Sequence, residues 1–467
     1  MKPKILLILC LFLVGCASKR QEPCKPGKVL YQSTVACYHE VDPLNSGEEL
    51  TLEPMIDIAL RNNPDTMRAW ATARSAYAFH KQTLSDNYPE INVVDDLRHT
   101  HISAENSRLS FTNTVYNYNL IASYLLFDFG TRCYLHQSSR FAFHAARWSK
   151  DFTFQSVILE VIDRYTNYLR ALETLKVREA DLADAKISLD VGEAQYRAGI
   201  RTKADYLQVK SEHVNAEIQL ETAKGNVEIA LANLKNALGV TMNTPLRVAG
   251  LPEDFSPQDL NFVVDALIET GKSLRKDLWA IFATAEQKKA DWKAASTLGY
   301  PELTGDWIYG KSYNAIPNED YHNIGTISLR VPIFRGFFYE YNEKRAYQDF
   351  LAARADVRNK ELEVGLEVTT SYWNLKTSYR KYLRSVEYLE YSQEAYESTL
   401  ENYKAGVGGL QALINSQDTL ARARTQIVQD TADWVISLAN LIFSTGILDE
   451  NFSATDPWQN EEIIGEK

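Results

Sequence analysis

Apolar residues recur every seven positions along two stretches of this sequence, and the two stretches lie at one fixed offset. From Val161 to Tyr196 every seventh residue is apolar or aromatic, and so is the residue 207 positions after each of them, up to Tyr403. A sustained seven-residue apolar period is typical of helices packed in a left-handed supercoil. Two such stripes in register predict that one unit of the chain is duplicated. The pairs are Val161/Val368, Tyr168/Leu375, Leu175/Tyr382, Leu182/Leu389, Leu189/Tyr396 and Tyr196/Tyr403.

Each unit is expected to contain the same elements in the same order: a helix, two alternating stretches, a very long helix, a tip and a return helix. At 1.5 Å per residue the long helix would extend about 100 Å, and two shorter helices placed end to end would match it. A plain four-helix bundle is the alternative interpretation of the stripes, and the alternating stretches argue against it. The expected ranges are 52–87, 89–101, 114–127, 131–197 and 202–238 in the first unit, and 260–298, 300–310, 323–333, 338–404 and 409–445 in the second.

The duplication divides the chain into two repeats with flanking segments. The linker between the repeats contains proline, and both ends of the chain lack a strong apolar period. The expected segments are a lipoprotein signal peptide, 1–15; a lipidated N-terminal linker, 16–50; the first repeat, 51–249; a linker, 250–257; the second repeat, 258–447; and a polar C-terminal tail, 448–467.

The first residues have the features of a secretory signal peptide. Lys2 and Lys4 precede an apolar run, Ile5 to Val14, that is too short for a stable membrane-spanning helix. The run ends in Leu-Val-Gly-Cys, which resembles a bacterial lipobox, so Cys16 is expected to carry a lipid that anchors the chain in the outer membrane. An ordinary signal peptide with an incidental cysteine is the alternative. If Cys16 is acylated, Cys24 and Cys37 either form a disulfide in an oxidising periplasm or remain free thiols.

The alternating stretches have one aromatic or apolar face and one mostly polar face. In TVYNYNLIASYLLF, which begins at Thr114, Tyr116 and Tyr118 alternate with Asn117 and Asn119. This alternation suits a barrel strand with lipid outside and water inside, although half of a soluble sheet would give the same pattern in any single strand. A membrane barrel must close, and four strands are too few to close one. Several copies of the chain are therefore expected to share one barrel.

Taken together, these features resemble the outer-membrane efflux protein family, the TolC-like outer-membrane factors, over about residues 50–447. Besides the duplication and the lipobox, the resemblance rests on three paired motifs: YPEI and YPEL, LFDFG and IFRGF, and YRAG and YKAG. It implies a mainly α-helical fold with a membrane β-barrel. The assembly would be a homotrimer with a long periplasmic α-helical tunnel and a 12-stranded barrel, to which each chain gives four strands.

The function implied by the resemblance is that of the outer-membrane channel of a tripartite efflux or type I secretion system. The channel would be a passive export duct in the bacterial outer membrane, surrounded by outer-membrane lipid. Its partners would be a periplasmic adaptor (membrane fusion) protein and an inner-membrane pump driven by protons or ATP. It would do no chemistry, so no enzyme activity and no cofactor are expected. The alternative function is a lipid-anchored periplasmic coiled-coil scaffold without channel activity.

The resemblance places the two helix-to-helix tips at the periplasmic end, where they gate the tunnel and contact the adaptor. Gly199 and Gly406 suit the position after a helix end, where a positive φ is needed. Arg197 and Lys404 lie near helix C-termini, where a cation is mildly favoured, so simple capping also explains these residues. The residues assigned to the adaptor-facing tips are Tyr196, Arg197, Ala198, Gly199, Ile200, Thr202, Tyr403, Lys404, Ala405, Gly406 and Val407.

The resemblance also assigns a gate to the tips. In members of the family an Asp six residues after the first tip glycine is linked to a Tyr three residues before the second, and here these are Asp205 and Tyr403. Some gates add an Arg two residues after the second glycine, and acids six and nine residues after it. Those positions hold Gly408, Ala412 and Asn415. We therefore expect fewer ionic contacts and an uncharged or weakly polar constriction, unless Asp205 is an ordinary acid at a helix N-terminus.

Charge and motifs disfavour several other functions. The net charge is −11, from 50 Lys+Arg against 61 Asp+Glu, and nucleic-acid binding needs a basic surface instead. The run GKS at 271–273 lacks the first glycine of a phosphate-binding loop, because Ala266 stands there. His99 and His101 could face one way on a strand and bind a metal, but a hydrated position in the barrel wall is the favoured interpretation, so no metal site is assigned.

Overall fold

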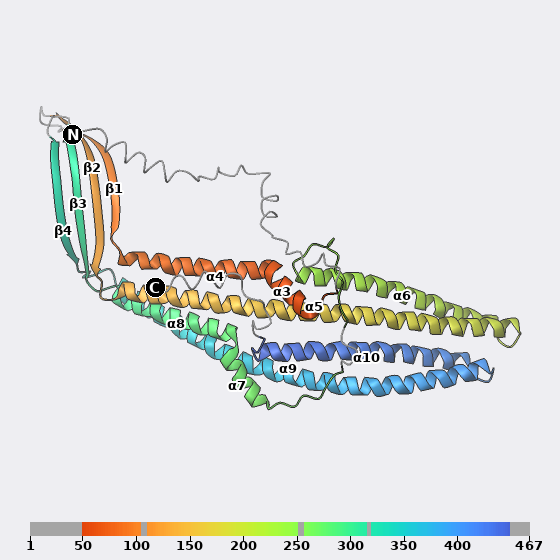
Figure 1. Ribbon diagram of the computed structural model, residues 1–467. Helices are drawn as coiled ribbons and strands as arrows, with labels where there is room; N and C mark the ends of the chain where they lie inside the picture. The colour runs from red at the N-terminus through yellow and green to blue at the C-terminus, as the bar shows by residue number, and fades with distance from the viewer. Residues whose placement is uncertain (1–48, 104–109, 251–255, 315–318, 449–467) are drawn as a thin grey trace. The chain divides into compact units, whose positions relative to one another are not determined.

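The computed structural model describes residues 49–103, 110–250, 256–314 and 319–448. Within these residues the two halves contain matching elements in the same order, as Figure 1 shows, and none of their helices is long and apolar enough to cross a membrane. The first half consists of α3 (Leu52–Asn62), α4 (Pro64–Thr83), the 3-10 helix η3 (Leu84–Asn87), β1 (Glu90–Ser103), β2 (Ser110–Phe127), α5 (Thr131–Arg197) and α6 (Lys203–Ala237). The second consists of α7 (Val264–Leu274), α8 (Lys276–Thr297), β3 (Glu302–Asn314), β4 (Glu319–Arg330), α9 (Phe338–Lys404) and α10 (Leu410–Ser444).

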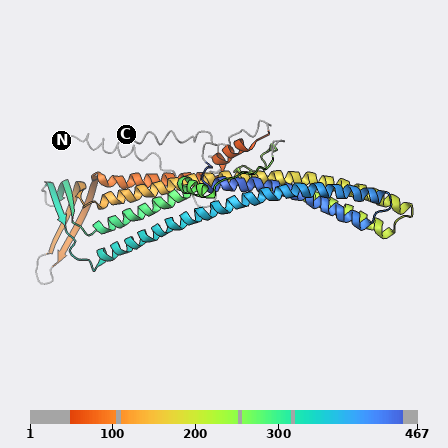
Figure 2. The same ribbon diagram turned by 90° about the horizontal axis from the view of Figure 1, so that it is seen from below.

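The longest helices form two antiparallel hairpins. The C-terminal part of α5 packs against α6, and that of α9 packs against α10 (Figure 1). The shorter α3 and α4 lie beside the N-terminal part of α5, and α7 and α8 lie beside that of α9 (Figure 2). Each long helix has 67 residues, so it extends about 100 Å at 1.5 Å per residue. One return helix and two short helices therefore cover the length of one long helix.

The four strands form a single antiparallel sheet in the order β1-β2-β3-β4. The central pair, β2 and β3, comes from different halves of the chain, so the sheet joins the two repeats. Trp307, Tyr309 and Tyr313 stand at alternate positions of β3 and are exposed, as the predicted aromatic face requires. The predicted fold class, long helices with four strands per chain, is confirmed.

The prediction of one unbroken helix at the start of each repeat was wrong. In the first repeat Pro64 lacks an N–H and restricts Asn63 to extended backbone, with ψ of 128°. The Asn63 side chain accepts from the backbone N–H of Asp65 (2.8 Å) and donates to the carbonyl of Ala237 (3.0 Å). In the second repeat Arg275 stands at the break with ψ of 121°, although no proline follows it. At this break Arg275 pairs with Asp277, two residues further on, and with Glu367 of α9.

Gly239, just after α6, lets the chain pass close to the break between α3 and α4. Its φ is +68°, and a Cβ there would lie 2.6 Å from the carbonyl oxygen of Asn62. Gly239→Ala is therefore expected to lower the free energy of unfolding by about 1–3 kcal/mol. The control is Gly225→Ala within α6, where no atom lies within 4 Å of the added methyl, and it should raise that free energy by about 0.5–1 kcal/mol. Urea unfolding followed by circular dichroism measures both changes, and shifts of the same sign would contradict the prediction.

Candidate functional site at the hairpin tips

The tips of the two hairpins have the same backbone conformation. Gly199 and Gly406 have φ of +75° and +76°, where any side chain would be strained. The N–H of the residue after each glycine donates to a carbonyl in the last helical turn, which is the Schellman arrangement. These hydrogen bonds run from Ile200 to Gln195 (2.9 Å) and from Val407 to Asn402 (3.1 Å). Both glycines therefore end their helices in the same way, and the repeated spacing of 207 residues reflects a repeated turn.

Most of the predicted tip residues are exposed, including Ile200 (61%) and Val407 (80%). The Tyr196 ring stacks on Tyr206 of α6 with the ring centroids 5.4 Å apart, and Arg197 pairs with Glu193 of its own helix. Thr202 caps α6. The exposed members of the predicted set are Tyr196, Arg197, Ala198, Gly199, Ile200, Thr202, Lys404, Ala405, Gly406 and Val407. Contact of these residues with an adaptor remains a prediction.

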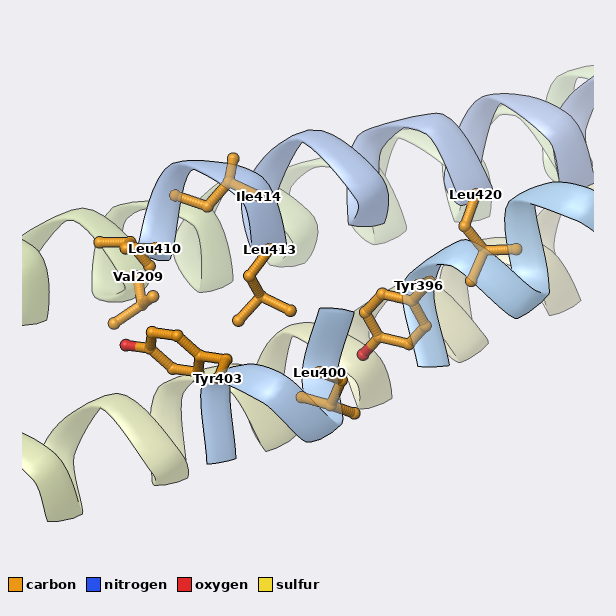
Figure 3. Packing of buried hydrophobic residues seen from close by; sticks show 8 residues of the cluster. All are labelled: Val209, Tyr396, Leu400, Tyr403, Leu410, Leu413, Ile414 and Leu420. Carbon is orange, nitrogen blue, oxygen red and sulfur yellow. The ribbon is translucent and has the colours of Figure 1, made fainter. Parts of the chain in front are cut away.

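Tyr403 differs from the rest of the predicted tip because it is fully buried. Its ring packs in a cluster with Val209 of α6 and with Leu410 and Leu413 of α10 (Figure 3). In the part of the chain that the structure describes, its hydroxyl has no hydrogen-bond partner, and burial raises its pKa. The carboxylate of Asp205 instead accepts from the N–H of Thr202, 3.2 Å away, in a capping box. No hydrogen bond joins Asp205 to Tyr403 in this conformation, and their link remains a prediction.

The other predicted gate residues lie on the second hairpin. Ala412 and Asn415 are exposed on α10, and Asn415 accepts a hydrogen bond from Gln411 of the same helix at 2.9 Å. Gly408 is half-buried, and a Cβ there would lie 2.9 Å from the backbone nitrogen of Tyr403. A side chain as long as arginine therefore does not fit at position 408 in this conformation.

A row of polar residues joins the two hairpins, and the sequence analysis did not find it. Asp181, Ser188 and Gln195 stand seven residues apart on α5, and all three are buried. We call these three residues the polar seam, because each contacts the second hairpin through a polar atom. Their partners are Arg424 Nη1 (3.1 Å), the side chain of Gln417 (3.2 Å) and the carbonyl of Tyr403 (2.7 Å). The period of seven was present in the sequence, but polar residues with that period look like a solvated helix face.

Arg424 of α10 lies between two carboxylates of α5. Its Nη1 is 3.1 Å from Asp181 Oδ1 and 2.8 Å from Asp184 Oδ2, and Arg178 contacts the second oxygen of Asp181 at 3.0 Å. Burial raises the pKa of Asp181, although both arginines act to lower it. The Asp181 carboxylate is therefore poorly hydrated, and its charge depends on the arginines beside it.

Other candidate sites contribute less. Among the described residues no group of three or more His, Cys, Asp or Glu side chains is arranged to hold a metal ion. His99 and His101 contact Thr114 (2.9 Å) and Thr112 (2.8 Å) on the neighbouring strand. The predicted lipid site at Cys16, and Cys24 and Cys37, lie outside the described residues.

Two helices of about 100 Å, each covered along its length by shorter helices, and one four-stranded sheet that joins the two repeats define the class of fold, a long helical body with a small antiparallel sheet. Comparison with known proteins agrees with this class. The model of the family "Outer membrane efflux protein" matches residues 55–240 and 267–447, with one match in each half of the chain. The chain therefore belongs to the outer membrane efflux protein family.

Individual relatives are distant but match over long stretches. The chain is 24% identical over 422 residues to the protein CyaE of Bordetella pertussis, covering 89% of this chain and 88% of CyaE. It is also 24% identical over 308 residues to the alkaline protease secretion protein AprF of Pseudomonas aeruginosa, covering 63% of this chain and 62% of AprF. Among solved structures, the CmeC outer membrane channel of Campylobacter jejuni matches with a TM-score of 0.78 at 18% identity, over 88% of each chain. The similarity to CmeC shows a shared fold.

Proposed function

We propose that this chain forms the outer-membrane channel of a tripartite efflux or type I secretion system, a passive duct through which an inner-membrane pump exports its substrate. The proposal rests chiefly on the family match in both halves of the chain. The sheet supports it, because four strands are too few to close a membrane barrel and other copies must complete one. The proposed assembly is a homotrimer with a 12-stranded barrel in the outer membrane and a helical tunnel in the periplasm.

The proposed partner at the tips is a periplasmic adaptor protein, which connects the tunnel to the pump. The exposed Ile200 and Val407, next to the exposed cations Arg197 and Lys404, offer an apolar contact with a charged edge at each tip. The relatives include one named for protease secretion and one named for pyoverdine export. Both a protein substrate with an ATP-driven pump and a small molecule with a proton-driven pump are therefore consistent with the proposal.

The decisive test is a measurement of ion conduction. The full-length protein, extracted with detergent, is expected to run as a trimer and to conduct ions when reconstituted in planar lipid bilayers. The alternative, a lipid-anchored periplasmic scaffold, predicts a chain that dissolves in water once its lipid is removed and that never conducts. A water-soluble, non-conducting monomer would overturn the proposed function.

We also propose that the chain consists of a signal peptide, 1–15, and two repeats, 51–249 and 258–447. After removal of the signal peptide, Cys16 would carry a lipid anchor. Cys16→Ala is expected to abolish incorporation of radioactive palmitate into the protein, because the thiol is the group that would take the diacylglycerol. Cys24→Ala is the matched control and should leave labelling at the wild-type level. Labelling that persists in the Cys16→Ala protein would disprove lipidation at this residue.

A further inference from the structure

Arg201 and Gly408 occupy equivalent positions in the two repeats, each two residues after its tip glycine. The structure brings them into direct contact, because the guanidinium Nη2 of Arg201 donates a hydrogen bond to the carbonyl of Gly408. The same guanidinium lies over the ring of Tyr403, 5.2 Å from its centroid. One side chain of the first hairpin therefore contacts the second hairpin on both sides of its tip glycine.

The surroundings of Arg201 favour this position. Its Nε is 3.4 Å from the side-chain oxygen of Gln195, whose amide nitrogen in turn donates to the carbonyl of Tyr403 at 2.7 Å. Because α9 ends at Lys404, the guanidinium also lies near the C-terminal carbonyls of that helix, where a positive charge is favoured. Gly408 has no room for a side chain of its own, so the cation at this contact comes from the first repeat.

We propose that Arg201 is a positioning residue that holds the tip of the second hairpin against the first and so keeps the tunnel entrance closed. This inference rests on the proposed channel function. Tyr403 is unable to secure the contact through its hydroxyl, which has no partner among the described residues, but its ring and carbonyl are both held by the first hairpin. Arg201 is only half-buried, so water can replace its hydrogen bonds and the contact can be released.

Single-channel recording tests the role of Arg201 directly. Arg201→Ala removes the hydrogen bond to Gly408 and the contact with the Tyr403 ring, and it is expected to raise the ratio of open to closed channel by about tenfold. The matched control is Lys203→Ala. It removes the same charge from an exposed side chain at the start of α6, close to the same tip, so the ratio of open to closed channel should equal that of the wild type. Trimer formation in detergent is checked for every variant.

A second variant keeps the proposal testable if Arg201→Ala assembles poorly. Arg201→Lys keeps a charged donor for Gly408 but loses the flat group that stacks on Tyr403, so its open fraction should lie between those of the wild type and Arg201→Ala. Equal open fractions in the wild type, Arg201→Lys and Arg201→Ala would overturn the role of Arg201 while leaving the channel function intact. A wild-type trimer that does not conduct at all would instead overturn the proposed function.

Discussion

Arg424→Met is expected to destabilise the packing of the two hairpins by about 3–5 kcal/mol at neutral pH, because removing one partner of a buried ion pair leaves the other charge uncompensated. The Arg424 side chain is only 18% exposed, and it pairs with both Asp181 and Asp184. Arg178 stays beside Asp181, so we expect a value at the lower end of this range. Denaturant unfolding of the purified protein, together with hydrogen exchange along the polar seam, measures the loss.

The difference in free energy of unfolding between the wild type and Arg424→Met, called the deficit below, should become smaller as the pH falls. The pKa of Asp181 is already raised by burial in the wild type, and loss of Arg424 raises it further. A carboxyl whose folded pKa is raised binds its proton more tightly in the folded than in the unfolded state, so acidification from neutral pH toward its ordinary pKa of 3.8 relieves the cost of the buried charge. The part of the deficit that comes from the unpaired charge is gone once Asp181 is protonated in both states.

Arg422→Met is the matched control for this prediction. Arg422 precedes Arg424 by two residues on the same helix, and it is exposed. Its loss should change the free energy of unfolding by less than about 0.5 kcal/mol, as at most surface positions. Similar losses in the two variants, or a deficit of Arg424→Met that grows on acidification, would contradict the assignment of Arg424 as the buried partner of Asp181.

Much of this fold was predictable because duplication repeats the apolar pattern and the turn residues together. The tip glycines, Gly199 and Gly406, followed from their spacing, since both positions need a positive φ. The four strands followed from their alternation. Arg275 could not have been predicted to break a helix, because its extended backbone depends on carboxylates far along the chain or beyond the break.

The contacts between the hairpins could not be predicted from the sequence for a different reason. The leucine stripe through Leu182 and Leu189 drew attention to one face of α5, yet both leucines are only partly buried within this chain. The polar seam is more buried than these leucines, and only tertiary structure shows that Asp181 faces Arg424 rather than water. Arg201 was missed because the resemblance directed attention to an arginine in the second repeat, where Gly408 stands.

Arg275→Leu is expected to destabilise the protein by about 3–5 kcal/mol, because it leaves a buried carboxylate without its main partner. The Arg275 side chain is 3% exposed. It contacts both oxygens of Asp277, at 3.0 and 2.6 Å, and it also pairs with Glu367 of α9. The cluster therefore ties the break between α7 and α8 to the long helix. In Arg275→Leu that carboxylate would keep its ion pair with Lys360, 3.0 Å away, and the hydrogen bond from the backbone N–H of Leu278, also 3.0 Å.

In the wild-type protein the pKa of Asp277 is shifted in the opposite direction to that of Asp181. The contribution of Asp277 to the free energy of unfolding therefore changes with pH in the opposite sense. Burial alone would raise the pKa of Asp277, but Arg275 and Lys360 outweigh burial and hold the pKa below its ordinary value of 3.8. A carboxyl with a lowered folded pKa contributes stability that is present above its unfolded pKa and is lost as the pH falls through its folded pKa. Wild-type protein should therefore lose this contribution only in strong acid, below pH 3.8. The deficit of Arg275→Leu should be largest near neutral pH.

A double variant separates the unpaired charge from the lost packing around Arg275. Arg275→Leu with Asp277→Leu replaces the buried pair by apolar side chains, which is often neutral, so it should recover most of the stability lost in Arg275→Leu. Arg358→Leu is the surface control, since Arg358 is 70% exposed and its pair with Glu361 contributes at most about 0.5 kcal/mol. Thermal unfolding of the purified proteins compares these three variants with the wild type. A double variant that is less stable than Arg275→Leu alone would contradict this prediction. It would show that the contacts of Asp277 stabilise the break even without Arg275, so that the unpaired charge is not the cause of the loss.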